Sequence, residues 1–226
     1  MTPGMNPAPD VIVGLDVQAT RGCPYVAIRP DGITTFAGWV GRANVDEIAE
    51  SLLGEISKRP EQRFAFGIDA PRCALTQPRR WYWHGGKNSW RPRGAAERGW
   101  GRHCEIVVSA HRLANPQWSP LAADVPAWMT MGFRLFEILG EHGEVFEVFP
   151  SASYAQLRDD PSVTASIRIA DFWTNQKDML DALVAAITVR EYLAGRGCAV
   201  GGGDGFGSII LPRLLKSPIE AVARWP

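Results

Sequence analysis

Acidic residues near the C-terminus are the first feature that points to chemistry. Asp178 and Asp181 lie three residues apart in a segment whose apolar residues recur at helical spacing, so both carboxylates would lie on one flank of the same helix. Asp181 falls closer to the buried face, where an unpaired carboxylate is costly and needs a base, a capped backbone or a metal ion as its partner. Taken alone, the two aspartates also fit the edge of an ordinary packing helix.

Two further aspartates, each at the end of a short apolar run, favour the chemical interpretation. Asp16 follows the run 11–15, and Asp69 follows the run 64–68. Both runs predict buried strands, and ligands of open α/β sheets gather at the carboxyl ends of such strands. Glu147 is a weaker candidate, because an acid in the middle of a strand can face either side of the sheet.

Four carboxylates brought together without a nearby cation raise one another's pKa values, and a divalent cation removes this conflict. Mg²⁺ or Mn²⁺ prefers oxygen ligands, and Mg²⁺ is often held by only a few carboxylates with water at its remaining positions. One or two such ions would activate water for hydrolysis of a phosphodiester. We therefore predict Asp16, Asp69 and Asp181 as catalytic residues and metal ligands, with Asp178 as a further ligand.

The elements that must position these residues follow from hydrophobic periodicity and turn signals. Predicted strands cover residues 11–16, 24–28, 33–40, 64–69 and 145–149, and predicted helices cover residues 44–56, 126–139, 151–157 and 175–194. The first three strands form an antiparallel meander, and a helical crossover makes the fourth parallel to an earlier strand. The fold class is therefore α/β, with a mixed five-stranded sheet in the order 3-2-1-4-5 flanked by helices. In that order Asp16 and Asp69 share one edge.

The composition is that of a soluble globular chain. Lys and Arg total 24, as do Asp and Glu, so the overall charge gives no sign of a nucleic-acid or membrane partner. The four cysteines lack metal-site spacing, and there is no apolar run of membrane-spanning length. Residues 1–10 lack the charged and apolar regions that are typical of a signal peptide. We expect a cytoplasmic protein that does not contact membranes, with a flexible tail over residues 1–10 and a single domain over residues 11–226.

Residues 72–125 are the least regular part of the chain and predict an insertion in this domain. The stretch 79–102 combines tryptophans with many basic residues and has Glu97 as its only acid. Basic groups neutralise phosphates and exposed aromatic rings stack on bases, so the predicted nucleic-acid contacts are Trp90, Arg91, Arg93 and Trp100. The same composition also fits a lid whose rings pack onto the domain beneath a cover of arginine side chains. The sequence leaves both interpretations open.

Several short blocks of the sequence belong to a pattern seen in a known family. They are Gly14-Leu15-Asp16, Gly67-Ile68-Asp69-Ala70-Pro71, Glu147-Val148-Phe149-Pro150-Ser151-Ala152, Lys177, residues 181–186 and residues 207–212. Together these blocks resemble the family called domain of unknown function 429. The segment Arg102-His103-Cys104-Glu105 is similar to the family's central Arg-x-Cys-Asp segment, with Glu in place of Asp. These blocks follow one another along most of the chain. The paired acids of the last predicted helix also resemble those of Holliday-junction resolvases in the same superfamily.

The resemblance implies a ribonuclease H-like fold and a metal-dependent nuclease that acts on DNA or RNA, because the family is described as predicted nucleases. It also implies Lys177, Arg102 and Glu105 as auxiliary site residues beside Glu147. The alternative from a different class is a non-catalytic module that binds nucleic acid or a protein partner and retains the fold. Nucleotide-phosphate chemistry in the style of actin-like ATPases would need a second lobe, for which this chain has little room.

Overall fold

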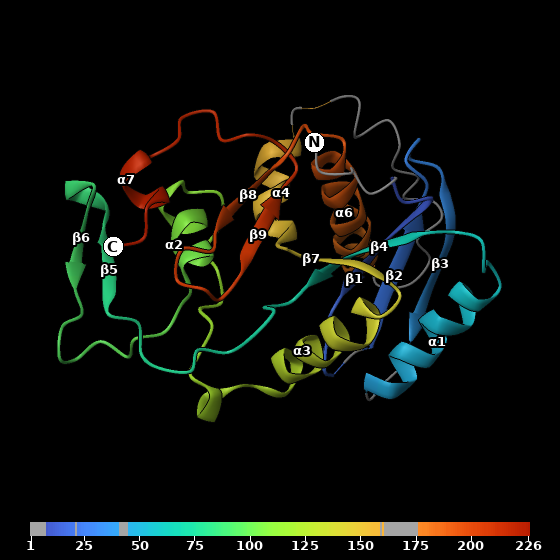
Figure 1. The fold of residues 1–226 in the computed structure, drawn as a ribbon, viewed down its shortest axis with the longest axis horizontal. Coiled ribbons are helices and arrows are strands. Elements are labelled where there is room, and N and C mark those ends of the chain that lie inside the picture. The colour runs from blue at the N-terminus through green and yellow to red at the C-terminus, as the bar shows by residue number, and fades with distance from the viewer. Residues whose placement is uncertain (1–7, 21, 41–44, 159, 161–175) are drawn as a thin grey trace, which may run out of the picture.

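A mixed sheet of seven strands, in the order β3-β2-β1-β4-β7-β9-β8, runs through the protein (Figure 1). The computed structural model describes residues 8–20, 22–40, 45–158, 160 and 176–226. The strands of the sheet are β1 (Val11–Asp16), β2 (Cys23–Ile28), β3 (Thr34–Val40), β4 (Phe64–Asp69), β7 (Gly143–Val148), β8 (Cys198–Gly201) and β9 (Ser208–Leu211). The α/β class is as predicted, but the predicted count of five strands is wrong. The strand β8 was missed because it has only four residues and leads into a run of glycines.

Four neighbouring strands, β1, β4, β7 and β9, run parallel, so their carboxyl ends meet at one edge of the sheet. The predicted meander of β1, β2 and β3 is confirmed, since both pairings are antiparallel. The predicted adjacency of the first and fourth strands is also confirmed, and Asp16 is the register partner of Asp69. Glu147 lies on the next strand, β7, opposite Ile68. Three acidic residues therefore stand on adjacent parallel strands near the same edge.

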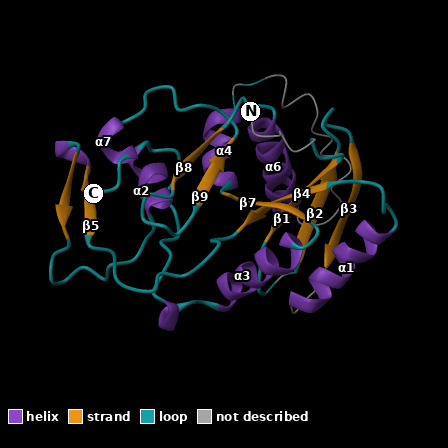
Figure 2. Ribbon diagram, viewed as in Figure 1, coloured by secondary structure: helices purple, strands orange, loops and turns teal. Residues whose placement is uncertain are grey.

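Helices cover both faces of the sheet (Figure 2). They are α1 (Val45–Ser57) and α3 (Ala127–Gly140) on one face, α4 (Pro150–Leu157) and α6 (Gln176–Leu193) on the other, and α2 (His103–Ala110) and α7 (Glu220–Ala223) beyond β8. Val13 and Leu15 of β1 pack in the core beside α1 and α3, whereas Ile12 packs in the core beside α6. Because side chains alternate along a strand, Asp16 faces the α6 side.

The helix α6 approaches β1 and β4 closely because each strand has a glycine at the contact. A Cβ atom added to Gly14 would lie 1.9 Å from the carbonyl oxygen of Ala182. A Cβ atom added to Gly67 would lie 2.8 Å from the carbonyl oxygen of Ala185. Gly14 and Gly67 are register partners, so the helix backbone contacts two adjacent strands at the same level.

This contact sets the position of the acidic residues of α6. Asp16 and Asp69 each follow the contact glycine of their strand by two residues, so they lie on the same face of the sheet as α6. Asp178 lies one helical turn before Ala182, and Asp181 directly precedes it. The first turns of α6 are thereby held over the acidic ends of β1 and β4.

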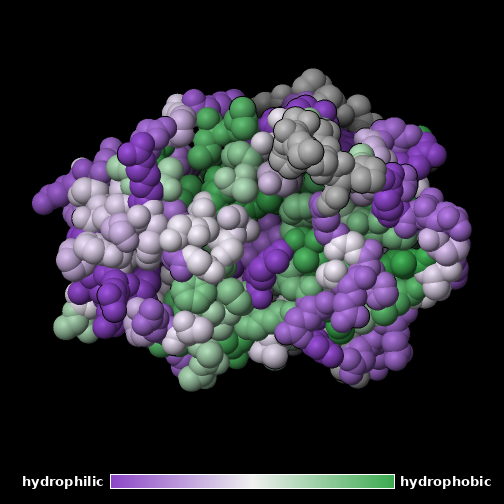
Figure 3. All heavy atoms as spheres, viewed as in Figure 1, coloured by the Kyte–Doolittle hydropathy of each residue, from purple (hydrophilic) through white to green (hydrophobic). Residues whose placement is uncertain are grey.

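The predicted insertion contains a separate hairpin at the opposite end of the molecule from α1 (Figure 1). It consists of β5 (Trp81–His84), the short 3-10 helix η1 (Gly85–Lys87) and β6 (Ser89–Pro92), and a second 3-10 helix, η2 (Ala122–Asp124), follows later in the insertion. The same stretch of the chain also contains the helix α2. In the face seen in Figure 3, the hairpin end carries mostly purple and pale residues, which are polar or only weakly hydrophobic.

Most of the expected N-terminal tail, residues 1–7, lies outside the described residues. All four cysteines are free thiols. Among the helices of the described segments, none combines the length and the apolar character that a membrane crossing requires.

The glycine contact gives a prediction for stability. Gly14→Ala should lower the free energy of unfolding by at least about 3 kcal/mol, because the added methyl group forces backbone rather than a flexible side chain to move. Gly54→Ala is the matched control, since Gly54 lies in α1 with nothing near its missing Cβ, and it should gain up to about 1 kcal/mol from helix propensity. Urea denaturation of both variants makes the comparison. Equal stability of Gly14→Ala and wild type would contradict the proposed contact.

Candidate functional site

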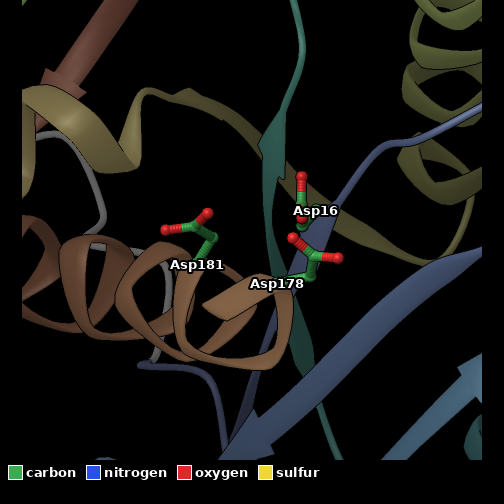
Figure 4. A group of neighbouring side chains, drawn as sticks. All are labelled: Asp16, Asp178 and Asp181. Atoms are coloured by element: carbon green, nitrogen blue, oxygen red, sulfur yellow. The ribbon is translucent and has the colours of Figure 1, made fainter. Parts of the chain in front are cut away.

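Three aspartate side chains converge where α6 meets the end of β1 (Figure 4). Asp16 comes from β1, and Asp178 and Asp181 come from α6. Each offers an oxygen such that all three atoms lie within 4.8 Å of one another, and the residues are only 7%, 4% and 7% exposed. Octahedral Mg²⁺ holds its ligand oxygens about 3 to 4 Å apart, so small side-chain adjustments would suit this group to one ion.

The electrostatics of the site favour a cation. The pKa of Asp16 is raised from its ordinary value of 3.8 to about 6. Burial is the largest cause, the charges of Asp181 and Asp178 add to it, and a hydrogen bond from Gln18 opposes it. Burial also raises the pKa of Asp69 well above its ordinary value, with Asp16 and Asp181 adding to the effect. Negative charge is therefore concentrated here in a poorly solvated region, and a bound cation would relieve it.

Within the described part of the chain, Lys177 brings a cation to the cluster, contrary to the expectation of wholly uncompensated acids. The ammonium of Lys177 lies 2.5 Å from Oδ2 of Asp181. The side chain of Lys177 is 82% exposed, so solvent screens this pair and its contribution to stability is small. The other oxygen of Asp181 accepts a hydrogen bond of 2.8 Å from the hydroxyl of Tyr154. Both contacts orient the carboxylate of Asp181.

Asp16 and Asp181 border a cavity of about 520 Å³ at the carboxyl edge of the parallel strands. Seven of the predicted site residues line it: Asp16, Asp69, Asp181, Lys177, Arg102, Glu105 and Glu147. The close group of three contains Asp178 and not Asp69, which instead lines the cavity as the neighbour of Asp16 on β4. The structure thus brings the predicted metal ligands and the predicted auxiliary residues to one place.

The auxiliary residues Arg102, Glu105 and Glu147 form a buried ion network in the wall of this cavity. Nη1 of Arg102 donates to Oε2 of Glu147 at 2.7 Å, and Nη2 donates both to Oε1 of Glu147 and to Oε1 of Glu105, the latter at 2.9 Å. The backbone N–H of Arg72 donates to Oε2 of Glu147 at 2.9 Å. Because both oxygens of Glu147 already accept hydrogen bonds from a buried cation, Glu147 serves to fix the wall in this arrangement and does not add a ligand to the aspartates.

Two of the predicted nucleic-acid contacts, Trp90 and Arg91, have partners within the chain. The indole N–H of Trp90 donates to the carbonyl oxygens of Ala221 and Arg224, and its ring packs edge-on against that of Trp225. Arg91 pairs with Glu97 at 2.5 Å. These contacts fit the lid interpretation, and binding of nucleic acid by Trp90 and Arg91 stays a prediction.

Two other predicted contacts lie nearby on the insertion. The ring of Trp100 lies under the guanidinium of Arg98, at 4.8 Å. Arg93 remains exposed, although its Nη1 donates to the carbonyl oxygen of Glu97 at 3.3 Å. The side chains of Trp100 and Arg93 therefore keep part of their surface accessible to solvent.

Sequence reasoning missed two residues that hold the aspartates in place. Nε2 of Gln18 donates to Oδ2 of Asp16 at 2.5 Å, and Tyr154 donates to Asp181 from α4. The position of Gln18, two residues after a strand-end aspartate, is a weak local signal for such a role. The pairing of Tyr154 with Asp181 spans 27 residues and has no signature in spacing.

Comparison of this chain with protein-family models, with curated proteins and with solved structures finds no match. What the site does must therefore be inferred from its own residues. They define an α/β protein with a buried group of carboxylates at the carboxyl edge of its parallel strands.

Asp16→Asn should stabilise the metal-free protein at neutral pH. The pKa shift from 3.8 to about 6 corresponds to at most about 3 kcal/mol, which the uncharged amide avoids. The carboxyl of Asp16 is protonated in both folded and unfolded chains well below pH 3.8 and ionised in both above about 6. The advantage of the variant should therefore be full near pH 7.5 and shrink as the pH falls through this window. Denaturant titrations in EDTA at several pH values measure it, and a variant less stable at neutral pH would contradict the assignment.

Arg102→Met should lower the free energy of unfolding by about 3 to 5 kcal/mol, because it leaves Glu105 and Glu147 buried without their cation. Arg134→Met is a matched control, since Arg134 pairs with Glu137 at the same i,i+3 spacing but on the exposed surface of α3. It should change stability little. Thermal and urea unfolding of the two variants make the test, and similar small losses in both would remove the structural role assigned to the network.

Proposed function

We propose that the chain is a metal-dependent nuclease that hydrolyses phosphodiester bonds in DNA or RNA. The observation that carries the proposal is the group of buried carboxylate oxygens of Asp16, Asp178 and Asp181, all within 4.8 Å of one another. This donor set offers hard oxygen ligands without His or Cys, which suits Mg²⁺ or Mn²⁺. Its place at the carboxyl edge of parallel strands is where open α/β sheets bind their ligands.

In this proposal the aspartates of the site are the metal ligands. Asp16, Asp178 and Asp181 would hold one ion, and Asp69, beside Asp16 on the same cavity, would share it or help to hold a second. A bound Mg²⁺ or Mn²⁺ would supply an activated water and neutralise charge on the phosphate. Tyr154 orients the carboxylate of Asp181 through its hydrogen bond, as outer partners of metal ligands commonly do.

We also propose that the architecture is ribonuclease H-like. The adjacent order β3-β2-β1-β4-β7 supports this proposal, with β9 and β8 added beyond β7. So does the resemblance of the blocks around Asp16, Asp69, Glu147 and Asp181 to the family called domain of unknown function 429. In this proposal the hairpin of β5 and β6 is an addition to the common sheet.

A non-catalytic module is the competing function, and one observation favours it. Lys177 lies 2.5 Å from Asp181 and supplies a positive charge to the cluster without any metal ion. If that charge suffices, the acidic residues need not bind metal, and the domain would act through binding alone. The two functions make different predictions for cleavage.

The purified protein should cleave at least one substrate from a panel of single-stranded, duplex, hybrid and branched nucleic acids when Mg²⁺ or Mn²⁺ is present. Asp181→Asn should reduce the rate by at least about 100-fold, since loss even of an outer partner of a metal ligand costs about 10- to 100-fold. Asp31→Asn, which changes an exposed aspartate paired with Arg29, is the matched control and should keep full activity. Ca²⁺ should support little turnover because its coordination is looser.

Two results would separate the alternatives. Absence of cleavage across the panel with both metals, together with metal-independent binding of nucleic acid, would favour the module. A metal-induced rise in melting temperature that disappears in Asp181→Asn would keep the metal site, because only a ligand bound to the folded state stabilises it. Equal stabilisation of wild type and Asp181→Asn would exclude that site.

A further inference from the structure

A second cavity, of about 540 Å³, lies between α2 and the β5–β6 hairpin and has no part in the proposed hydrolysis. The polar and aromatic residues of its wall include Arg79, Tyr82, Asn88, Ser109, Arg112 and Trp118. None of the described residues that line it is acidic. Its volume is in the usual range for small-molecule sites, which is about 300 to 1,000 Å³.

Arg79 places a half-buried guanidinium in this wall. Its guanidinium carbon lies 3.9 Å from the ring centroid of Tyr82 and 5.2 Å from that of Trp118. Its Nε and Nη1 atoms are buried and have no hydrogen-bond acceptor within the described part of the chain. Burial lowers the pKa of Arg79, and the largest opposing contribution comes from Tyr82. Buried donors of a charged group that lack acceptors are costly, so an acceptor entering the cavity would complete the arrangement.

Arg112, an exposed residue, lines the same cavity. Its backbone has a φ of 55°, in the left-handed region that residues other than glycine, asparagine and aspartate rarely adopt. Asn88 and Ser109 add neutral hydrogen-bonding groups to the wall. Two arginines without a neighbouring acid in the cavity form an environment that favours an anion with several acceptor oxygens.

We propose that this cavity binds a phosphate group through Arg79 and Arg112. Arginine is suited to this task because its planar fork of donors matches the oxygens of phosphate. The phosphate has two potential sources, a small phosphorylated compound or a phosphate of a nucleic-acid strand. The second source rests on the proposed nuclease function, whereas phosphate binding itself does not.

Calorimetric titration of the full chain with inorganic phosphate, in EDTA to keep divalent ions from the acidic site, tests the proposal. Wild-type protein should bind, and Arg79→Met should bind at least about tenfold more weakly, which corresponds to about 1.4 kcal/mol. Arg112→Gly should show a comparable loss and is the safer variant, because glycine adopts a φ of 55° without strain. Arg134→Gln, an exposed arginine of α3, and Asp181→Asn should both bind as wild type does.

Two outcomes would overturn the proposal. One is a wild-type protein that shows no binding of phosphate, which would mean that water fills the cavity. The other is unchanged binding in Arg112→Gly. Because Asp181→Asn removes the proposed metal site but not this cavity, failure of the nuclease and failure of the phosphate site are distinguishable.

A competition experiment identifies the source of the phosphate. A 5′-phosphorylated single-stranded oligonucleotide that inorganic phosphate displaces, and that Arg112→Gly binds weakly, would support phosphate recognition on a nucleic-acid strand. Binding of inorganic phosphate and a nucleoside monophosphate without any such displacement would support a small phosphorylated compound.

Discussion

The backbone of α6 contacts β1 and β4 at Gly14 and Gly67, and the geometry of the acidic site depends on this contact. A side chain at either position would push the helix away from the sheet and separate the aspartates of α6 from the strand ends. Close packing of a protein interior transmits such a shift because there is little empty volume to absorb it. Gly14 and Gly67 therefore determine how close α6 comes to the aspartates two residues further along each strand, although neither glycine lines the cavity.

The two groups of buried acids next to the cavity differ in how their charge is balanced. Glu105 and Glu147 share the guanidinium of Arg102, and backbone and Ser119 donors complete their hydrogen bonds. A buried carboxylate balanced in this way is locked into the structure. In the second group, the cation paired with Asp181 is the exposed Lys177, and burial raises the pKa of Asp16. The second group, unlike the first, would gain from a cation supplied by solvent.

Much of this site was predictable from the sequence, because strand-end acids in a parallel sheet share an edge whatever the details of packing. Asp16 and Asp69 follow clear apolar runs, and the first two turns of α6 place Asp178 and Asp181 three residues apart. What the sequence lacks is information on tertiary partners. Spacing does not reveal that Arg102 neutralises Glu147, 45 residues away, or that the ring of Trp90 packs against Trp225. The four-residue strands of the hairpin and of β8 are too short for alternation to identify them.

The cavity beside Asp16 and Asp181 and the cavity beside Arg79 are lined by consecutive residues of one segment. This segment is bonded to the buried network of Arg102. Gln117 lines the first cavity, Trp118 lines the second, and the next residue, Ser119, donates its backbone N–H to Glu105. A Cβ atom at Gly101 would lie 2.5 Å from the ring of Trp118 and 3.0 Å from Nη1 of Arg79, so the chain just before Arg102 is packed against the second cavity. The buried guanidinium of Arg102 thereby holds Glu105 in place in the wall of the cavity beside Asp16 and Asp181. Through its hydrogen bond to Ser119, it also holds the residue next to Trp118, whose ring contacts Arg79.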